Sequence, residues 1–282
     1  MKKRVVFFLL FFMCLFYSYA QVKEFSVKGI EKEIVKVNDT LYAFRYETSN
    51  LEYNIFLNVI ARKDSALYKM YRIDSLKWIE MLHQEALAKY YHRHPSFNHY
   101  PALCMSYEGA VAYCNWLTEL YNNDPARKLK KVSFVLPTEQ EWELAALGNR
   151  NNVTYPWGTN SLRETKKSNW QGMFLANYRH VGDASIISDP NGNPVFKSME
   201  NEVQSDGLRD MALYTSDVKA FFPNSIGIYN QSGNAAEMTI QKGLTKGGSW
   251  NSYGGEITIA YKLFFYQPSP EVGFRVFMKI EP

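Results

Sequence analysis

The sequence predicts a single α+β domain with an unusually large share of irregular chain. Apolar residues recur at helical spacing in several segments between residues 51 and 147, and short alternating segments beside them indicate strands. Beyond Gly148, glycine, asparagine and proline interrupt most of the chain, and "DPNGNP" at 189–194 is dense in turn residues. The chain has no internal repeat and no linker-like change in composition after its first twenty residues, so one domain over 21–282 is favoured.

The N-terminal segment 1–20 has the features of a secretory signal peptide. Three basic residues at 2–4 precede an apolar run from Val5 to Tyr17, and Ser18-Tyr19-Ala20 forms a small-x-small cleavage pattern. The run is shorter than the ~20 apolar residues of a transmembrane helix. Cys14 lies inside the run without the small residues that precede a lipid-modified cysteine. We therefore expect an exported protein with no transmembrane span and no lipid anchor.

Charge and cysteine content narrow the function classes. Removing the signal takes three basic residues from 32, which leaves 29 against 28 acidic residues and lowers the formal charge from +4 to +1. Nucleic-acid binding then lacks its electrostatic driving force. If Ser106 caps a helix that carries Cys114, the rise of ~1.5 Å per residue puts Cys104 and Cys114 near 12 Å apart, beyond the ~7 Å limit of a disulfide. Two buried free thiols are expected.

The first elements follow from local periodicity. Residues 25–46 alternate apolar and polar types around an Asn38-Asp39 turn and predict a pair of strands. A short helix is predicted over 50–60, and one continuous helix with a heavy aromatic load over 74–91.

Two later helices have recognisable starts. Ser106 is placed to cap a helix that carries Cys114. After the basic stretch "RKLKK", the segment "VSFVL" predicts a short strand that leads into a further helix. Thr138 and Glu141 form a capping box at the start of that helix, because each side chain covers an unpaired backbone N–H.

Several segments, in order along the chain, resemble the formylglycine-generating enzyme, or sulfatase-modifying factor, family. They are "YETSNLEYNIFL" (46–57), "YPALCMSYEGAVAYCNWL" (100–117), "LPTEQEWELAA" (136–146), "YPWG" (155–158), "PNSIGIYNQSGNAAEM" (223–238), "KGGSW" (246–250) and "GFRV" (273–276). The resemblance implies a C-type-lectin-like α+β fold with little regular secondary structure, which agrees with the irregular second half.

The resemblance also implies two calcium sites. The first would use the side chain of Asn230, the carbonyls of Gly233 and Ala235 and the carboxylate of Glu237, which are hard oxygen ligands of the kind calcium prefers. The alternative for Glu237 is that it caps a turn or meets a basic residue.

The resemblance places a second calcium site in the segment from 177 to 212. Its ligands fall on Asn177, Tyr178, Asp210 and Ala212.

The chain departs from the enzymes of this family at their copper site. The two cysteines that hold copper in those enzymes correspond to Ser252 and Ile257, and no cysteine follows Cys114. Thiolates are the soft ligands that suit Cu(I), so copper is not expected. His92, His94 and His99 resemble a metal set only weakly, since a proline follows His94, and a loop with solvated imidazoles is favoured.

The resemblance extends to one branch of the family. A long aromatic insert over about 62–98 and the segment ending in "GNAAEM" resemble gliding-motility and type IX secretion proteins of the GldK/PorK kind, which are thought to be structural parts of an envelope complex. Known members of that branch are longer lipoproteins, and Ala236 stands where the enzymes usually carry Trp.

The function expected is a non-catalytic, exported scaffold or binding protein, periplasmic or outer-membrane associated, with calcium and protein partners in the envelope. The insert is the expected partner surface; the alternative is that its aromatic residues are core. Two further functions stay open. One is a formylglycine-generating oxidase or other oxidoreductase, and the other is a lectin-like binding protein with a pocket around Ser249, Trp250, Ser252 and Arg275.

Overall fold

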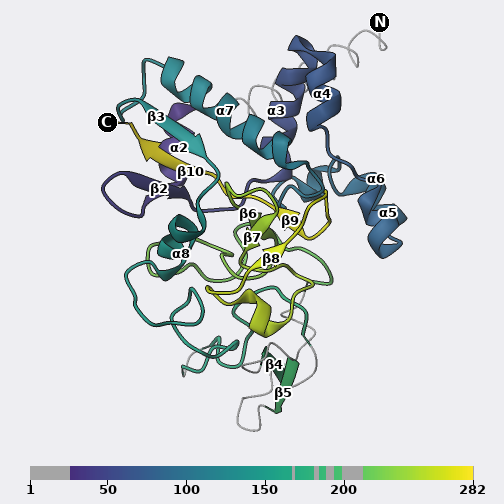
Figure 1. The fold of residues 1–282 in the computed structure, drawn as a ribbon, viewed down its shortest axis with the longest axis vertical. Coiled ribbons are helices and arrows are strands. Elements are labelled where there is room, and N and C mark those ends of the chain that lie inside the picture. The colour runs from purple at the N-terminus through teal and green to yellow at the C-terminus, as the bar shows by residue number, and fades with distance from the viewer. Residues whose placement is uncertain (1–25, 167–168, 181–183, 189–193, 199–211, 282) are drawn as a thin grey trace, which may run out of the picture.

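The computed structural model describes residues 26–166, 169–180, 184–188, 194–198 and 212–281 (Figure 1). The predicted signal peptide lies outside these residues. The described helices are Val27–Glu33 (α2), Asn50–Lys63 (α3), Ser65–Tyr71 (α4), Lys77–Leu82 (α5), Glu85–Tyr90 (α6), Tyr107–Asn123 (α7) and Glu139–Leu147 (α8), with short 3₁₀ turns at Pro95–Phe97 (η1) and Gly254–Ile257 (η2). No helix in these ranges is long and apolar enough to cross a membrane.

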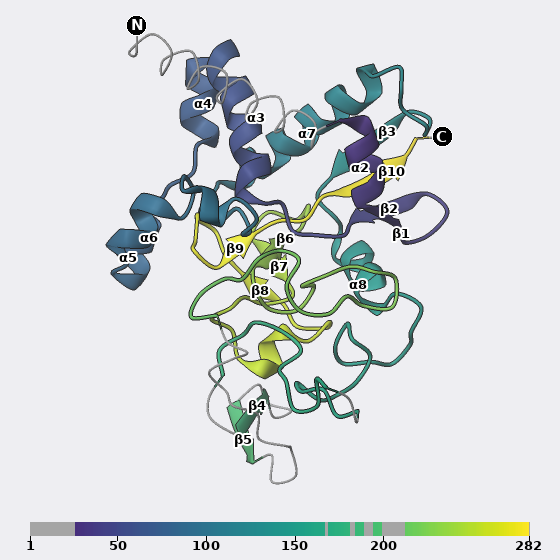
Figure 2. The ribbon, with the colours of Figure 1, turned by 180° about the vertical axis from the view of Figure 1, so that it is seen from behind.

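An antiparallel sheet joins the two ends of the domain. Its strand order is β1-β2-β10-β3, with the strands Ile34–Lys36 (β1), Leu41–Phe44 (β2), Val132–Val135 (β3) and Phe277–Ile280 (β10). Successive residues of β10 face opposite sides: Phe277 packs in a cluster with Trp142 of α8, and Met278 in the main core with α2, α3 and α7. The sheet therefore has helices on both faces (Figure 2).

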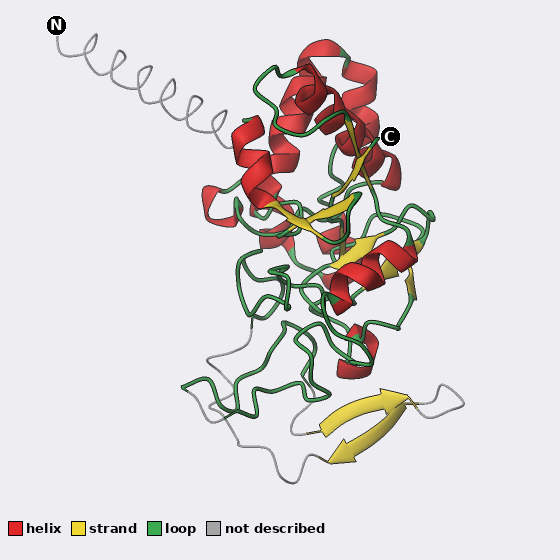
Figure 3. Ribbon diagram, turned by 90° about the vertical axis from the view of Figure 1, so that its left-hand side faces the viewer, coloured by secondary structure: helices red, strands yellow, loops and turns green. Residues whose placement is uncertain are grey.

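The second half of the chain forms small sheets joined by long loops (Figure 3). One sheet has the order β8-β7-β6-β9, and β6 and β9 run parallel. A separate antiparallel hairpin pairs β4 with β5. The strands are Ala184–Ser188 (β4), Pro194–Ser198 (β5), Ala236–Met238 (β6), Leu244–Lys246 (β7), Leu263–Phe264 (β8) and Val272–Gly273 (β9). The predicted α+β class with a large irregular share is confirmed.

Two predicted elements differ from the structure. The first part of 25–46 is the helix α2, capped by Ser26, and only β1 and β2 form the expected hairpin. The predicted helix over 74–91 is two short helices, because His83 adopts a left-handed conformation with φ of 55° and ends α5.

Local capping signals were more reliable. Ser106 caps α7 through the N–H of Gly109, and Thr138 and Glu141 form the predicted capping box of α8. Cys104 and Cys114 are free and buried, as expected, and burial raises the pKa of both thiols.

Candidate functional site

The carboxylate of Glu237, on β6, faces a buried arginine. Glu237 is 1% exposed and Arg275 is 0% exposed. Arg275 donates from Nη2 to Glu237 Oε1 at 2.6 Å and from Nε to Oε1 and Oε2 at 3.0 and 3.2 Å. The indole Nε1 of Trp142 donates to Glu237 Oε2 at 2.7 Å. Three donors therefore hold one carboxylate in the interior.

This geometry bears on the first implied calcium site. A carboxylate offers about four acceptor positions, and three N–H groups of Arg275 and Trp142 make the four contacts, because the Nε–H of Arg275 is shared between Oε1 and Oε2. In this arrangement both carboxylate oxygens of Glu237 accept hydrogen bonds from protein donors. The geometry favours the alternative in which Glu237 meets a basic residue, and calcium at this turn stays a prediction.

The turn before Glu237 is held by a second carboxylate that sequence reasoning missed. Glu47 accepts from the Nδ2 of Asn230 at 3.1 Å, from the Nδ2 of Asn234 at 3.0 and 3.1 Å, and from the N–H of Ala235 at 3.1 Å. Asn230 and Asn234 both have positive φ, 51° and 62°, a conformation that asparagine tolerates better than most residues. Burial raises the pKa of Glu47 to about 8, although Arg275 opposes the shift.

Within the same turn, Gly233 has no room for a side chain. Its φ is 75°, and a Cβ atom would stand 2.2 Å from the carbonyl oxygen of Asn177. Asn177 also accepts from the N–H of Asn234 at 2.7 Å. The turn is thereby fixed against the segment that carries the second implied calcium site.

Asn177 has an unusual feature for a buried residue. Its Nδ2 donates to the carbonyl of Tyr214 at 2.7 Å and to Asn234 Oδ1 at 3.3 Å, while its Oδ1 is buried with no hydrogen-bond partner among the described residues. Buried polar atoms are normally satisfied. Tyr178 is buried and Ala212 half-buried, whereas Asp210 lies outside the described residues. The unpartnered Oδ1 is an oxygen of the kind that a hard cation binds, and calcium at this site stays a prediction.

The positions of the enzymes' copper cysteines hold a hydroxyl and an alkyl side chain. Ser252 Oγ accepts from the N–H of Ser249 at 3.0 Å, and Ser249 Oγ donates to Glu271 Oε2 at 2.9 Å. Asn251 Nδ2 donates to the other oxygen of Glu271 at 3.1 Å. Ile257 is fully buried in an apolar cluster. Ser249 and Ser252 are thus brought together in a hydrogen-bonded cluster that contains no thiol.

The lectin-like alternative placed a pocket around Ser249, Trp250, Ser252 and Arg275. All four side chains are buried. Trp250 donates its indole N–H to the carbonyl of Pro270 at 3.0 Å, and Arg275 is directed to Glu237 and to the carbonyls of Phe44 and Tyr229. The lectin-like alternative stays a prediction, and these contacts place its four residues inside the core.

The three histidines of the insert do not act together. His92 is buried rather than solvated: its Nδ1 pairs with Asn50 Oδ1 at 2.9 Å, and its Nε2 accepts from Trp78 Nε1 at 3.3 Å. Burial lowers the pKa of His92 to about 3. His94 and His99 are exposed. The expectation of solvated imidazoles was therefore wrong for His92, which is a core hydrogen-bonding residue.

The fold and these buried networks define an α+β protein with a formylglycine-generating-enzyme-like framework and no thiol pair at the copper positions. The model of the sulfatase-modifying factor enzyme 1-like domain matches residues 31–280. The chain belongs to that family.

Curated relatives include active and inactive members. The chain is 33% identical to the formylglycine-generating enzyme of Bos taurus over 143 residues, 50% of this chain and 26% of that protein. It is 28% identical to the Mus musculus enzyme over 227 residues, 71% of this chain and 49% of that protein. It is 29% identical over 144 residues to the inactive C-alpha-formylglycine-generating enzyme 2 of Bos taurus, 51% of this chain and 33% of that protein. The matched regions span less than half the length of these relatives.

Among solved structures, CarF matches with a TM-score of 0.50 and 17% sequence identity, over 88% of this chain and 93% of that chain. At this identity the likeness concerns the fold alone.

Proposed function

We propose that this protein is a non-catalytic, exported scaffold or binding protein built on the formylglycine-generating-enzyme fold. The observation that carries the proposal is the pair Ser252 and Ile257 at the copper positions. Ser252 is 5% exposed and Ile257 is 0% exposed. Cys104 and Cys114 cannot replace the missing thiols, because both are buried and burial raises the pKa of each, whereas the metal ligand is the thiolate.

Copper titration tests the proposal. The protein, loaded with Cu(I) in the presence of a competing chelator, should bind no more copper than a Cys104→Ser/Cys114→Ser variant. The double substitution Ser252→Cys/Ile257→Cys should gain Cu(I) binding and serves as the positive control. Tight Cu(I) binding that survives the loss of Cys104 and Cys114, together with oxidation of a cysteine peptide, would favour the oxidase.

The insert supplies the surface proposed for a partner in the envelope. Trp78 and Tyr91 are buried against Leu103 and Trp250, so part of the aromatic load is core. Other apolar side chains of α4 to α6 are exposed: Tyr68 (38%), Met70 (57%), Leu76 (59%), Met81 (40%) and Tyr90 (44%). α5 and α6 project from the body in Figures 1 and 2. Exposed apolar patches mark interaction sites, and Leu76, Met81 and Tyr90 on this projecting segment support the proposal.

The partner class proposed is the type IX secretion or gliding-motility machinery. A tagged protein recovered from gently solubilised envelopes should co-purify with components of that machinery. Leu76→Asp and Met81→Asp should release them, whereas Phe264→Asp, at a residue 55% exposed on β8, should not. Recovery of a sulfatase-like client instead would contradict the assignment.

Calcium is proposed at the second implied site. The buried, unpartnered Oδ1 of Asn177 supports it, and the carbonyls of Tyr178 and Ala212 with the carboxylate of Asp210 would complete an oxygen ligand set. A bound ion would hold the segment around Asn177 against the turn at Asn234. Its role would be structural.

A further inference from the structure

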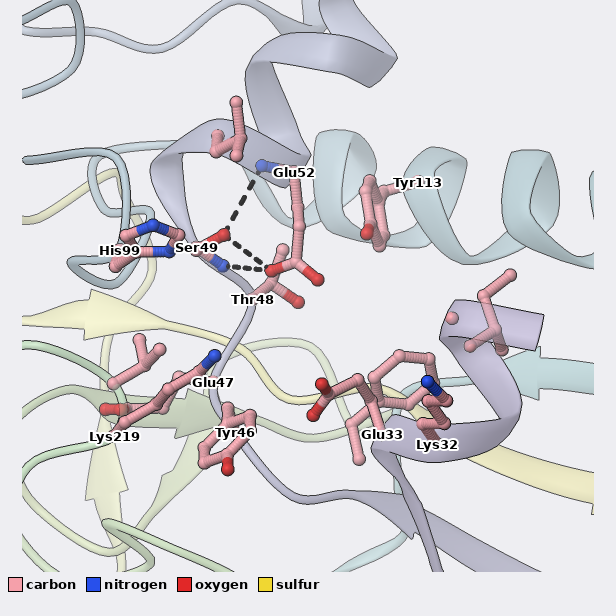
Figure 4. A pocket seen from close by; sticks show the side chains of 15 residues that line it. Lys32, Glu33, Tyr46, Glu47, Thr48, Ser49, Glu52, His99, Tyr113 and Lys219 are labelled. Atoms are coloured by element: carbon pink, nitrogen blue, oxygen red, sulfur yellow. Dashed lines mark hydrogen bonds between the residues drawn. The ribbon is translucent and has the colours of Figure 1, made fainter. Parts of the chain in front are cut away.

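A cavity of about 230 Å³ lies between α2, the start of α3 and the loop at Val218 (Figure 4). It shares no lining residue with the cluster of Ser249 and Ser252. Small-molecule sites usually measure ~300–1,000 Å³, so an occupant of this cavity is smaller than a drug-sized ligand. The scale is that of an amino acid or a dipeptide.

The cavity wall presents charged groups of both signs. Glu33 of α2 and Glu52 of α3 carry carboxylates into the space, and Thr48 lies between them with its hydroxyl (Figure 4). Lys219 lines the cavity from another segment. Its Nζ lies 5.1 Å from the centroid of the Tyr46 ring, which also lines the cavity.

Two of these charges have no oppositely charged partner in the described part of the chain. Among the described residues, neither Glu33 nor Lys219 forms an ion pair. Glu33 is half-buried, and a carboxylate in that position loses hydration that a bound cation would replace. The pKa of the Tyr46 phenol is raised, mainly by burial and secondly by the negative charge of Glu33.

The cation that suits this wall is organic. In the described part of the chain, no three His, Cys, Asp or Glu side chains come together as a metal site. An ammonium group can pair with Glu33 and can also lie against an aromatic ring, here Tyr46, whereas Glu52 Oε2 already accepts from the N–H and the hydroxyl of Ser49. Lys219 supplies the opposite charge for a carboxylate on the same ligand.

We propose that this cavity binds a small zwitterion of amino-acid or dipeptide size, with its ammonium group at Glu33 and its carboxylate at Lys219. This inference goes beyond the scaffold role, and neither depends on the other. Glycylglycine is the probe, and isothermal titration calorimetry is the measurement. N-acetyl-glycylglycine, which has no ammonium group, should bind at least tenfold more weakly.

Matched variants locate the site. Glu33→Gln should weaken glycylglycine binding at least tenfold, whereas Glu119→Gln, which removes the same charge from an exposed position of α7, should leave it unchanged. Lys219→Gln should weaken glycylglycine but not glycylglycinamide, which lacks the carboxylate. Because Lys219 is exposed, this variant tests the site even where Glu33→Gln disturbs folding.

Three outcomes would overturn the proposal. They are no binding of glycylglycine by the wild-type protein, equal binding of its acetylated form, and unchanged binding in both Glu33→Gln and Lys219→Gln. None of these outcomes bears on copper, so failure here and failure of the non-catalytic assignment are separate results.

Discussion

At the scale of single residues, the ion pair between Glu237 and Arg275 stands out because both charged side chains are buried. Both side chains are buried, and Arg275 also donates to two backbone carbonyls. Removing one partner of a buried pair leaves an uncompensated charge, whereas replacing both by apolar groups is often far less costly. The effect of this pair on the free energy of unfolding therefore depends mainly on its burial, because a single remaining charge would be left in the interior without a partner.

Arg275→Met should therefore lower the free energy of unfolding by about 3–5 kcal/mol. The double variant Glu237→Met/Arg275→Met should recover part of that loss, because the unpaired carboxylate is gone. Urea denaturation of the variants measures both values. Lys242→Met, at an exposed ion pair with Glu108, is the control and should change stability by no more than about 1 kcal/mol. A double variant less stable than Arg275→Met would refute this account.

Glu47 makes stability depend on pH. Its pKa is raised from 4.5 to about 8 in the folded state, mainly by burial. Between these values the folded protein holds a proton that the unfolded chain has released, so the free energy of unfolding falls as the pH rises from about 4.5 to 8. In Glu47→Gln this contribution should be absent. Unfolding free energies at several pH values give the slope.

The difference in slope between wild type and Glu47→Gln is the quantity to compare. Groups that do not interact with Glu47 contribute equally to both slopes and cancel, including His92, whose pKa is lowered by burial to about 3. Equal slopes in the two proteins would mean that Glu47 stays ionised when buried, held by Asn230 and Asn234.

At the scale of elements, features set by residues close in sequence were predicted correctly, whereas features set by tertiary packing were not. The capping box of Thr138 and Glu141 involves residues three apart, so the sequence contains all of its information. The helix end at His83 could not be predicted in this way, because the left-handed residue that ends a helix is usually glycine and here it is histidine. Residues 27–33 also read as alternating, yet they form α2 because Val27 and Ile30 pack on the main core.

The break at His83 gives a test at this scale. A residue with a Cβ atom in the left-handed region is strained by about 1–2 kcal/mol, and glycine is not. His83→Gly should raise the free energy of unfolding by up to about 1 kcal/mol, since the added freedom of the unfolded chain offsets part of the gain. His83→Ala keeps the Cβ atom and should bring no gain in urea denaturation. A gain of equal size from alanine would show that the backbone is not the cause.

At the scale of the whole molecule, the site residues that sequence reasoning missed are those whose partners lie far along the chain. Glu47 and Asn234 are 187 residues apart, and Trp142 and Glu237 are 95 apart. Neither periodicity nor spacing joins such positions. Asn230 and Glu237 were singled out through the family resemblance, and what they contact became visible only in the folded chain.

Removing calcium would test whether a bound ion holds the segment around Asn177 against the turn at Asn234. A ligand that binds only the folded state raises its stability, so a chelator should lower the melting temperature of the wild-type protein. Asn177→Ala should abolish that response, because the unpartnered Oδ1 is the proposed ligand. Glu237→Ala should lower the melting temperature with and without chelator and keep the response, since its carboxylate is occupied by Arg275 and Trp142.

The opposite result in the two variants would assign calcium to the first implied site instead of the second. If Glu237→Ala abolished the response to chelator and Asn177→Ala kept it, calcium would lie in the turn of Asn230 to Glu237, and the carboxylate would have to exchange a contact from Arg275 or Trp142 for the metal. Magnesium without calcium is the control, because its stricter octahedral geometry at shorter distances suits a carbonyl-rich site poorly. If chelator left the melting temperature of all three proteins unchanged, the calcium proposal would be wrong. The hydrogen bonds of the buried carboxylates Glu47 and Glu237 would then hold this turn without a metal ion.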